Sequence, residues 1–309
     1  MARLLLAGVP RSGTSWTGEA LGYCEGVRYV DEPDGFRDAY SFGVMMRYGE
    51  NPEVNLGDSV PAYERLWAGA FAGGRAPGSL RGRIAQRAYL SVETSVRQRA
   101  RAGEGVSPAL WLAARFASPP TTDSGAQHVL VKSVQCARSI EWIQQRFDPQ
   151  VALILRHPLN ALASWRDLGF VRNPREVAAL ADYARRRWSV AEPGPDASQL
   201  VHQAFMFGVL SEALISAASR HPEWVVVQHE ALCVDASAGL RELAARLGLA
   251  WTERAEQFVR DSDRSGDGYA TKRVASAQPD RWRDRLSNAD VDVIRRVLDA
   301  FPHRALAGG

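Results

Sequence analysis

Arg3-Leu-Leu-Leu-Ala-Gly-Val9, followed directly by Pro10-Arg-Ser-Gly-Thr-Ser-Trp16, is the stretch of sequence that decides the fold. A short, continuous apolar run is typical of a strand that is buried on both faces, as in a parallel sheet. Glycine and proline end this run, and helix-compatible sequence continues from Thr17 to Leu21. The stretch therefore predicts a buried strand, a tight loop and a helix, in that order.

Four more short segments along the chain are strand candidates, at residues 27–30, 128–132, 151–155 and 224–227. Apolar residues at helical spacing predict helices between and after these segments. The predicted helices lie at 140–147, 159–168, 174–190, 198–220, 240–247 and 291–301. Strands that alternate with helices pack as a mostly parallel sheet covered on both faces. The sequence thus predicts an α/β fold: one domain over residues 1–309, with a central, mostly parallel five-stranded sheet flanked by helices.

Residues 34 to about 126 contain no convincing buried strand. Helix-like segments around 61–72, 80–101 and 107–116 are separated there by glycine- and proline-rich breaks. We expect a helical insertion over one end of the sheet. Its large apolar side chains are more simply core at helical spacing than a recognition surface. These side chains are Phe36, Tyr40, Phe42, Met45, Met46, Tyr48, Trp67, Phe71 and Trp111.

Composition limits the class of protein. Hydrophobic residues make up 46% and charged residues 24% of the chain, which is enough for a sizeable core and excludes wholesale disorder. A net charge of +3 argues against a protein that coats nucleic acid. We find no stretch of about 20 apolar residues, so no membrane span is expected. The three scattered cysteines form neither a metal knuckle nor a disulfide framework, and we expect a cytoplasmic protein without a metal.

Only two of the 38 basic residues are lysines, Lys132 and Lys272. The general bias to arginine has a plain cause in genomic base composition. In such a background, a retained lysine can mark a place where a planar guanidinium does not substitute for a compact ammonium group.

The loop after the first strand favours an anion. Gly8 and Gly13 have the spacing of the nucleotide loop G-x-x-x-x-G-K-[ST], and Ser15 stands in its last position. Thr14 replaces the lysine, and the cation has moved inside the loop as Arg11. Such a P-loop-like turn aims backbone N–H groups and a helix N-terminus at a phosphate or sulfate. A plain strand-to-helix connection remains the alternative.

Pro10-Arg-Ser-Gly-Thr-Ser-Trp16 resembles the 5′-phosphosulfate loop of sulfotransferases that use 3′-phosphoadenosine 5′-phosphosulfate. That family's loop reads P-[KR]-[SA]-G-[ST]-[ST], and many members follow it with tryptophan. The resemblance implies that this cofactor is bound by Arg11, Ser12, Gly13, Thr14, Ser15 and Trp16. It also implies an enzyme of class EC 2.8.2 that needs no metal.

A second motif supports the same resemblance. Arg156-His-Pro158 is followed by Ser164, and the family's 3′-phosphate site reads R-x-P-x-x-x-x-x-S. The resemblance implies that Arg156 and Ser164 hold that phosphate through charge-assisted hydrogen bonds. A strand-end salt bridge and an ordinary helix serine are the alternative interpretation.

Proton transfer requires a base for the acceptor hydroxyl. Lys132 is followed by Ser133, so the K-T-H histidine of cytosolic family members is absent here. Protein-tyrosine sulfotransferases and some bacterial relatives use a glutamate just after the second strand, and Glu32 resembles it. Glu32 is therefore the expected general base, with Asp31 and Asp34 in reserve. A solvated turn carboxylate is the alternative.

Lys132 resembles the catalytic lysine of the tyrosine enzymes, whose role is to stabilise charge on the leaving phosphate. Arg11 is expected to share that role in catalysis. A lysine that merely closes a strand edge is the alternative for Lys132.

Lys272-Arg273 resemble the basic loop that folds over the 3′-phosphate in many relatives, although the surrounding sequence also fits a mobile loop. His229 stands where the family usually has a tyrosine, which puts an adenine contact in doubt.

The predicted function is transfer of a sulfuryl group to a hydroxyl of a small molecule, sugar, lipid or secondary metabolite. The insertion at 34–126 is expected to form part of the acceptor pocket. A bacterial origin and a role in secondary metabolism would fit, the oligomeric state is left open with a homodimer among the options, and no nucleic-acid partner is expected. The alternatives are a P-loop kinase or ATPase, which needs Mg²⁺ and a lysine at residue 14, and a relative that binds the cofactor without transfer.

Overall fold

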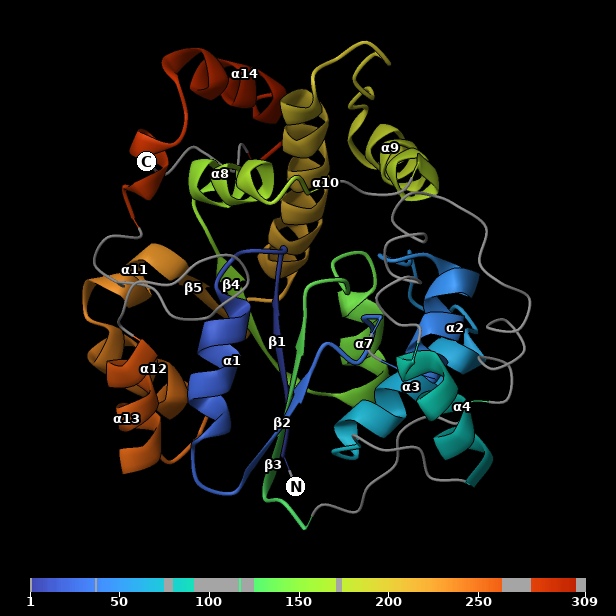
Figure 1. The fold of residues 1–309 in the computed structure, drawn as a ribbon, viewed down its shortest axis with the longest axis vertical. Coiled ribbons are helices and arrows are strands. Elements are labelled where there is room, and N and C mark those ends of the chain that lie inside the picture. The colour runs from blue at the N-terminus through green and yellow to red at the C-terminus, as the bar shows by residue number, and fades with distance from the viewer. Residues whose placement is uncertain are drawn as a thin grey trace.

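The computed structural model describes residues 2–36, 38–74, 80–91, 117, 125–170, 174–262 and 279–303. Within them, five parallel strands form one sheet in the order β2-β3-β1-β4-β5 (Figure 1). The strands are β1 (Ala2–Gly8), β2 (Val27–Asp31), β3 (His128–Ser133), β4 (Gln150–Leu155) and β5 (Val225–Gln228). The predicted α/β fold and its five strands are confirmed.

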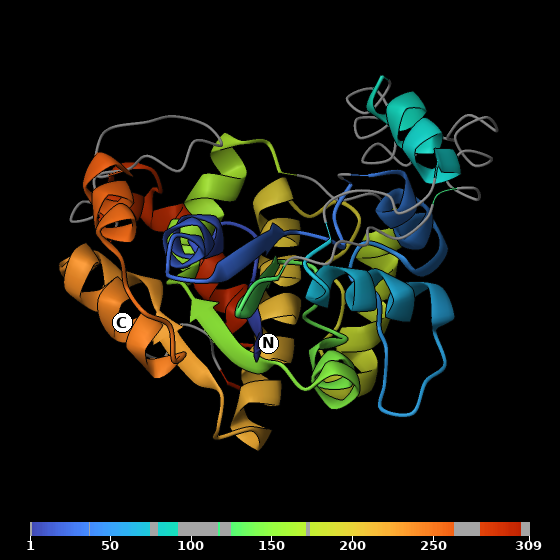
Figure 2. The ribbon, with the colours of Figure 1, turned by 90° about the horizontal axis from the view of Figure 1, so that it is seen from below.

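The two faces of the sheet carry separate cores, because successive side chains of a strand point to opposite sides. Leu4 and Leu6 of β1 belong to one hydrophobic cluster, and Leu5 and Ala7 belong to the other. Helices α12 and α13 lie on the first side, and α3 and α7 lie on the second (Figures 1 and 2). The first cluster includes side chains of α1 (Thr14–Gly22), α12 (Ala236–Arg246) and α13 (Glu253–Ser262). The second includes side chains of α3 (Pro61–Phe71), α7 (Ile140–Phe147), α8 (Pro158–Asp167), α9 (Pro174–Trp188), α10 (Gln199–Arg220) and α14 (Asn288–Leu298).

The helices that follow the neighbouring strands β1 and β3 pack on opposite faces of the sheet. Side chains of α1 lie in the first cluster, whereas those of α7 lie in the second. In open parallel sheets, ligands bind beyond the carboxyl ends of the strands where this divergence occurs. The fold therefore predicts a ligand site at the loops after β1, β3 and β4.

Three described helices lie between β2 and β3: α2 (Ala39–Tyr48), α3 and α4 (Leu80–Leu90). The expected helix at 61–72 is confirmed as α3, and α4 is the first part of the expected helix at 80–101. The remainder of that segment, the helix expected at 107–116 and Trp111 lie outside the described residues. The other apolar residues expected in the core are buried or pack partly buried against the clusters.

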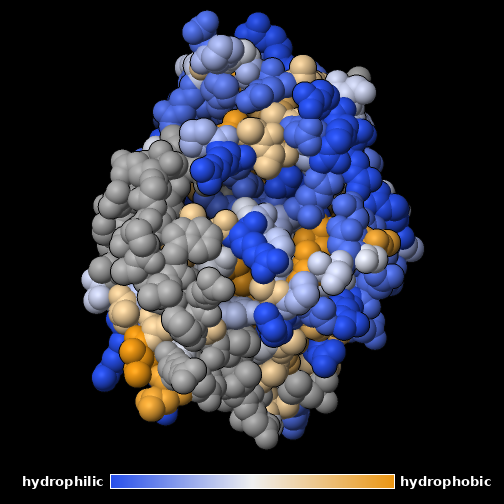
Figure 3. Space-filling model, turned by 90° about the vertical axis from the view of Figure 1, so that its right-hand side faces the viewer, coloured by the Kyte–Doolittle hydropathy of each residue, from blue (hydrophilic) through white to orange (hydrophobic). Residues whose placement is uncertain are grey.

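Figure 3 shows the side of the molecule that carries α2, α3, α4 and α9, where hydrophilic residues prevail over the described part. The large apolar residues exposed on α4 are Leu80, Ile84 and Leu90.

Three described helices have no counterpart among the predicted ones: α2, α11 (His229–Val234) and α13.

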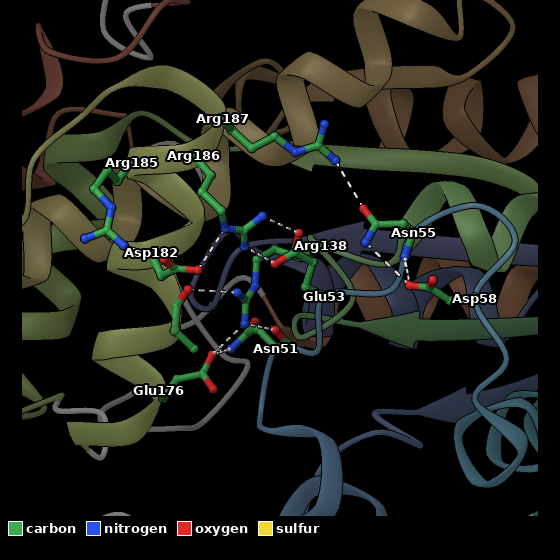
Figure 4. A network of polar contacts seen from close by, with 11 residues as sticks. Asn51, Glu53, Asn55, Asp58, Arg138, Glu176, Asp182, Arg185, Arg186 and Arg187 are labelled. Carbon is green, nitrogen blue, oxygen red and sulfur yellow. Dashed lines mark hydrogen bonds and ion pairs between the residues drawn. The ribbon is translucent and has the colours of Figure 1, made fainter.

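A polar network joins α9 to the segment that follows α2 (Figure 4). The carboxylate of Glu176 accepts a hydrogen bond of 2.9 Å from Nδ2 of Asn51, and Arg138 lies 3.8 Å from it. Arg138 also donates to the carbonyl of Asn51. These three side chains are buried, whereas the neighbouring ion pair between Arg186 and Glu53 is more exposed. The network fixes the insertion against the second face of the sheet.

Helix α10 is the longest described helix, and our expectation of no long apolar stretch is wrong at this point. By length and composition it could cross a bilayer, yet 72% of its apolar window is buried inside the protein. It packs against α8, α9 and α14. An apolar helix enclosed on several sides is typical of a buried core helix.

Candidate active site

The loop after β1 is wound tightly around its glycines. Gly13 has φ of 93° and Arg11 has φ of 69°, both in the left-handed region. A Cβ atom at Gly8 would lie 2.4 Å from Oγ of Ser12, and one at Gly13 would lie 2.0 Å from Cδ2 of His229. The loop is held from outside by Trp165, whose Nε1 donates to the carbonyl of Pro10 over 2.9 Å. Glycine is required at both positions because no side chain fits there.

The N-terminus of α1 emerges from this loop at Thr14, with Gly13 as its N-cap. No side chain caps it. The first N–H groups of a helix have no partner within the helix, and together with the helix dipole they favour an anion. The loop and the first turn of α1 therefore form a natural place for a phosphate or sulfate oxygen.

The two predicted anion sites lie side by side. Nε of Arg11 donates to Oγ of Ser164 over 3.0 Å, and Nη1 of Arg156 donates to the carbonyl of Arg11 over 2.8 Å. Residues 11 and 156 follow β1 and β4, which are neighbours in the sheet. The structure thus brings Arg11, Arg156 and Ser164 together, although they are far apart in the sequence.

Arg156 is buried and keeps its positive charge. Its side chain is only 10% exposed, and Glu230 lies 4.0 Å from its Nε. Burial lowers the pKa of Arg156 to about 10, against the raising effect of Glu230. The guanidinium is therefore still protonated at neutral pH. The carboxylate of Glu230 also accepts from the backbone N–H of His157, which fixes the strand end that carries Arg156.

Lys132 is enclosed on the other side of the phosphate loop. It is 1% exposed and forms an ion pair with Glu32, and Asp31 lies 3.3 Å from its Nζ. The same Nζ donates to Oγ of Ser15 in the first turn of α1 over 3.0 Å. A buried ammonium is costly unless it is paired, and here two carboxylates and a hydroxyl surround it. Lysine, base candidate and phosphate loop thus form one cluster.

Glu32 is held in place by its backbone as well as by Lys132. Its N–H donates to the carbonyl of Lys132 over 2.8 Å, and its φ of 45° is unusual for a residue with a side chain. The carboxylate is 26% exposed, so a ligand can reach it. Such a group, partly exposed and beside a cation, has the position that a general base requires.

Asp34 does not join this cluster. Its Oδ2 accepts a hydrogen bond from Oγ of Ser133 over 2.6 Å, and the residue is 2% exposed. Burial raises the pKa of Asp34 to about 7. Of the two carboxylates held in reserve, Asp31 lies beside Lys132 and Asp34 lies on the side of Ser133.

His229 is the site residue whose importance sequence reasoning missed. It directly follows β5, and its ring packs against Gly13 and, edge-on, against Trp16 with 6.1 Å between ring centroids. Burial lowers the pKa of His229 to about 3, and the charge of Arg156 acts in the same direction. The ring is therefore neutral at neutral pH. Its place after a strand, at the same edge as Arg11, is the signal that could have found it.

Trp16 is tied to α13, because its Nε1 donates to Oγ of Ser262 over 2.9 Å. Trp282 stacks on the ring of His157, the residue after Arg156, with an angle of 7° between the planes. Lys272 and Arg273 lie outside the described residues. Among the described residues, no group of His, Cys, Asp and Glu could hold a metal ion.

No protein-family model and no curated protein matches this chain. Among solved structures, it is similar to the sulfotransferase domain of the Synechococcus PCC 7002 olefin synthase, with 12% identity, coverage of 95% of this chain and 94% of that one, and a TM-score of 0.45. The sulfotransferase domain from the curacin biosynthetic pathway has 8% identity, 97% and 98% coverage, and a TM-score of 0.45.

Sulfotransferase STF9 from Mycobacterium avium has 12% identity, coverage of 97% of this chain and 76% of that one, and a TM-score of 0.40. Likenesses this low carry no weight in assigning an activity.

Proposed function

We propose that the protein is a sulfotransferase that moves a sulfuryl group from 3′-phosphoadenosine 5′-phosphosulfate to a hydroxyl of a small-molecule acceptor. The observation that carries the proposal is the contact between the two anion sites, in which Arg156 donates to the backbone of Arg11 and Arg11 to Ser164. A nucleotide with phosphates at both ends fits a site with cations from two neighbouring strand ends.

The residues present suit such a donor. The uncapped N-terminus of α1 and Arg11 suit the 5′ end, and the buried guanidinium of Arg156 with the hydroxyl of Ser164 suits the 3′-phosphate. Lys272 and Arg273 are proposed to add cations to that phosphate. When bound, the donor supplies an activated sulfuryl group, and adenosine 3′,5′-bisphosphate is the product.

The chain's own residues then have distinct tasks. Glu32 takes the proton of the acceptor hydroxyl while the oxygen of that hydroxyl attacks the sulfuryl group of the donor. Lys132 and Arg11 stabilise the negative charge that develops on the departing phosphate, and Ser15 positions the ammonium of Lys132 by accepting from it. Preorganised cations in a partly buried site act in this way without a metal, and we propose that none is needed. We also propose that the enzyme acts in the cytoplasm.

A kinase is the weaker candidate. Its loop needs lysine at residue 14 for the phosphates, and the residue there is Thr14. The two activities differ in the nucleotide they bind, since only the sulfuryl donor carries a 3′-phosphate.

Isothermal titration calorimetry with adenosine 3′,5′-bisphosphate and with ATP, without magnesium, tests the proposal. We expect tight binding of the bisphosphate and weak binding of ATP. Arg156→Ala should lose about 10- to 100-fold in bisphosphate affinity, the equivalent of a charge-assisted hydrogen bond. Arg220→Ala is the control, because Arg220 pairs with Glu141 at the surface. Equal affinity for the two nucleotides would overturn the proposal.

A further inference from the structure

Two residues after Glu32, the chain places a second carboxyl group on the opposite face of the sheet. Side chains alternate along β3, so Lys132 and Ser133 point to opposite sides. Lys132 meets Ser15 of α1 on the first face. Ser133 donates to Asp34, and Tyr63 of α3 lies close enough for the charge of Asp34 to affect its pKa. Asp34 therefore faces the side that carries the insertion.

Asp34 and Gln135 share the hydroxyl of Ser133. Oγ of Ser133 donates to Oδ2 of Asp34 over 2.6 Å and accepts from the backbone N–H of Gln135 over 3.0 Å. Among the described residues, neither Oδ1 of Asp34 nor Oε1 of Gln135 has a hydrogen-bond partner. Both residues are more than nine-tenths buried, at 2% and 9% exposed. Above about pH 7, where Asp34 is ionised, both oxygens are therefore buried acceptors without a donor among the described residues, and the hydroxyl of Ser133 links the two residues.

A buried acceptor without a donor is rare in folded proteins and calls for an explanation. Lys132, whose charge acts on Asp34, is already engaged with Glu32, Asp31 and Ser15. No described group supplies the missing donor, and neutral hydroxyls and ammonium groups are the donors that suit a carboxyl and an amide oxygen.

The pair lies beside the proposed base. The N–H of Gly35 donates to the carbonyl of Glu32 over 3.0 Å, which closes a tight turn with Asp34 inside it. The charges of Glu32 and Lys132 both act on the carboxyl of Asp34. Glu32 and Asp34 are therefore close together at the carboxyl end of β2.

We propose that Oδ1 of Asp34 and Oε1 of Gln135 form a subsite that receives a second donor group, a hydroxyl or an ammonium, on the acceptor molecule. The preferred acceptors are then polyols or amino alcohols rather than molecules with a single hydroxyl. This inference rests on the proposed sulfotransferase activity and names the acceptor class for the same site. Asp34 and Gln135 hold the acceptor in position, whereas Glu32 takes the proton.

Matched acceptor pairs that differ by one donor test the subsite. We choose catechol with 2-methoxyphenol, and ethane-1,2-diol with 2-methoxyethanol, with labelled sulfate donor. The wild-type protein should transfer to the donor-bearing member of each pair with a kcat/KM at least about tenfold higher, since a site that binds a hydroxyl rejects an analogue without one. Asp34→Asn and Gln135→Met should each bring the ratio close to one, mainly through KM.

Gln203→Met is the matched control, because Gln203 is a buried amide on α10 whose Oε1 also lacks a partner among the described residues. It should leave the ratio as in the wild type. A merely structural role of Asp34 or Gln135 would slow both members of a pair alike and keep the ratio. Equal transfer to both members by the wild type would overturn the subsite, as would no transfer at all with adenosine 3′,5′-bisphosphate still bound. Loss of bisphosphate binding by the wild type would instead overturn the proposed function.

Discussion

At the scale of single residues, the ion pair between Lys132 and Glu32 concerns both the stability of the fold and the proposed proton transfer. Lys132 is almost wholly buried, whereas Glu32 and Asp31 remain about a quarter exposed beside it. Removing one partner of a buried cation usually destabilises a protein, because the charge is left without compensation. Here a second carboxylate stays in place, so the proposed role of Glu32 in proton transfer can be separated from its role in stability.

Glu32→Gln should lower the transfer rate by about 10²- to 10⁴-fold, the usual loss when a general base is removed. Bisphosphate affinity should change little, because Asp31 still lies 3.3 Å from Nζ of Lys132. Single-turnover transfer and calorimetry measure the two quantities. Asp31→Asn is the matched control and should retain far more activity. Normal turnover in Glu32→Gln would assign the base to another group.

Asp34 makes stability depend on pH. Burial raises its pKa to about 7, the charge of Glu32 acts in the same direction, and Ser133 and Lys132 oppose it. Burial also raises the pKa of the facing Tyr63, which stays neutral over this range, as does the buried thiol of Cys136. Between about pH 4 and 7 the folded protein keeps a proton that the unfolded chain has lost.

The free energy of unfolding should therefore fall by about 1.4 kcal/mol per pH unit over that interval from this group alone, and level off above pH 7. Asp34→Asn should lack this component. Urea unfolding of both proteins at about pH 5, 6, 7 and 8 measures the difference in slope. Parallel curves for the two proteins would show that Asp34 is ionised in the folded state.

At the scale of elements, the turn from β1 into α1 depends on its contact with the ring of His229. Gly13 needs a left-handed conformation, and the ring of His229 occupies the space where a Cβ atom would lie. The backbone of the phosphate loop and the helix after β5 are thus fitted to each other. Neither requirement alone distinguishes this glycine from one in an ordinary turn.

Gly13→Ala should cost more than the roughly 1–2 kcal/mol of left-handed strain, and should weaken bisphosphate binding. Gly57→Ala is the matched control: Gly57 has φ of 89°, and a Cβ atom there has nothing within 4 Å. The control should show the strain alone. Urea unfolding and calorimetry of both variants test this, and equal losses of stability would mean that the contact with His229 is unimportant.

At the scale of the whole molecule, the network in Figure 4 joins elements from the insertion and the helix α9. Glu176→Ala removes the buried carboxylate that accepts from Asn51 and faces Arg138, and should lower the free energy of unfolding by about 3–5 kcal/mol. Asp182→Ala breaks an exposed pair with Arg186 and should cost far less, because solvent screens such a pair. Thermal and urea unfolding compare them. Similar costs would show that burial of the network adds nothing.

The sequence was informative where local pattern decides the structure. The three central strands β1, β3 and β4 are buried and appear as apolar runs, and short motifs located Arg11, Glu32, Lys132 and Arg156 at strand ends. Helix α13 was missed because charged residues such as Glu253 and Arg260 dominate it. The partner of Gly13 and the direction of Asp34 could not be predicted, since they depend on strand order and on contacts between distant segments.

The hydrogen bond between Arg11 and Ser164 has a consequence for selectivity. Arg11 binds the hydroxyl proposed to hold one phosphate, and Lys132 binds Glu32. An incoming polyanion has to exchange these internal partners for its own oxygens. Under the proposed function, a nucleotide with a single phosphate would compensate for only one exchange, so these internal contacts favour the bisphosphate over adenosine monophosphate.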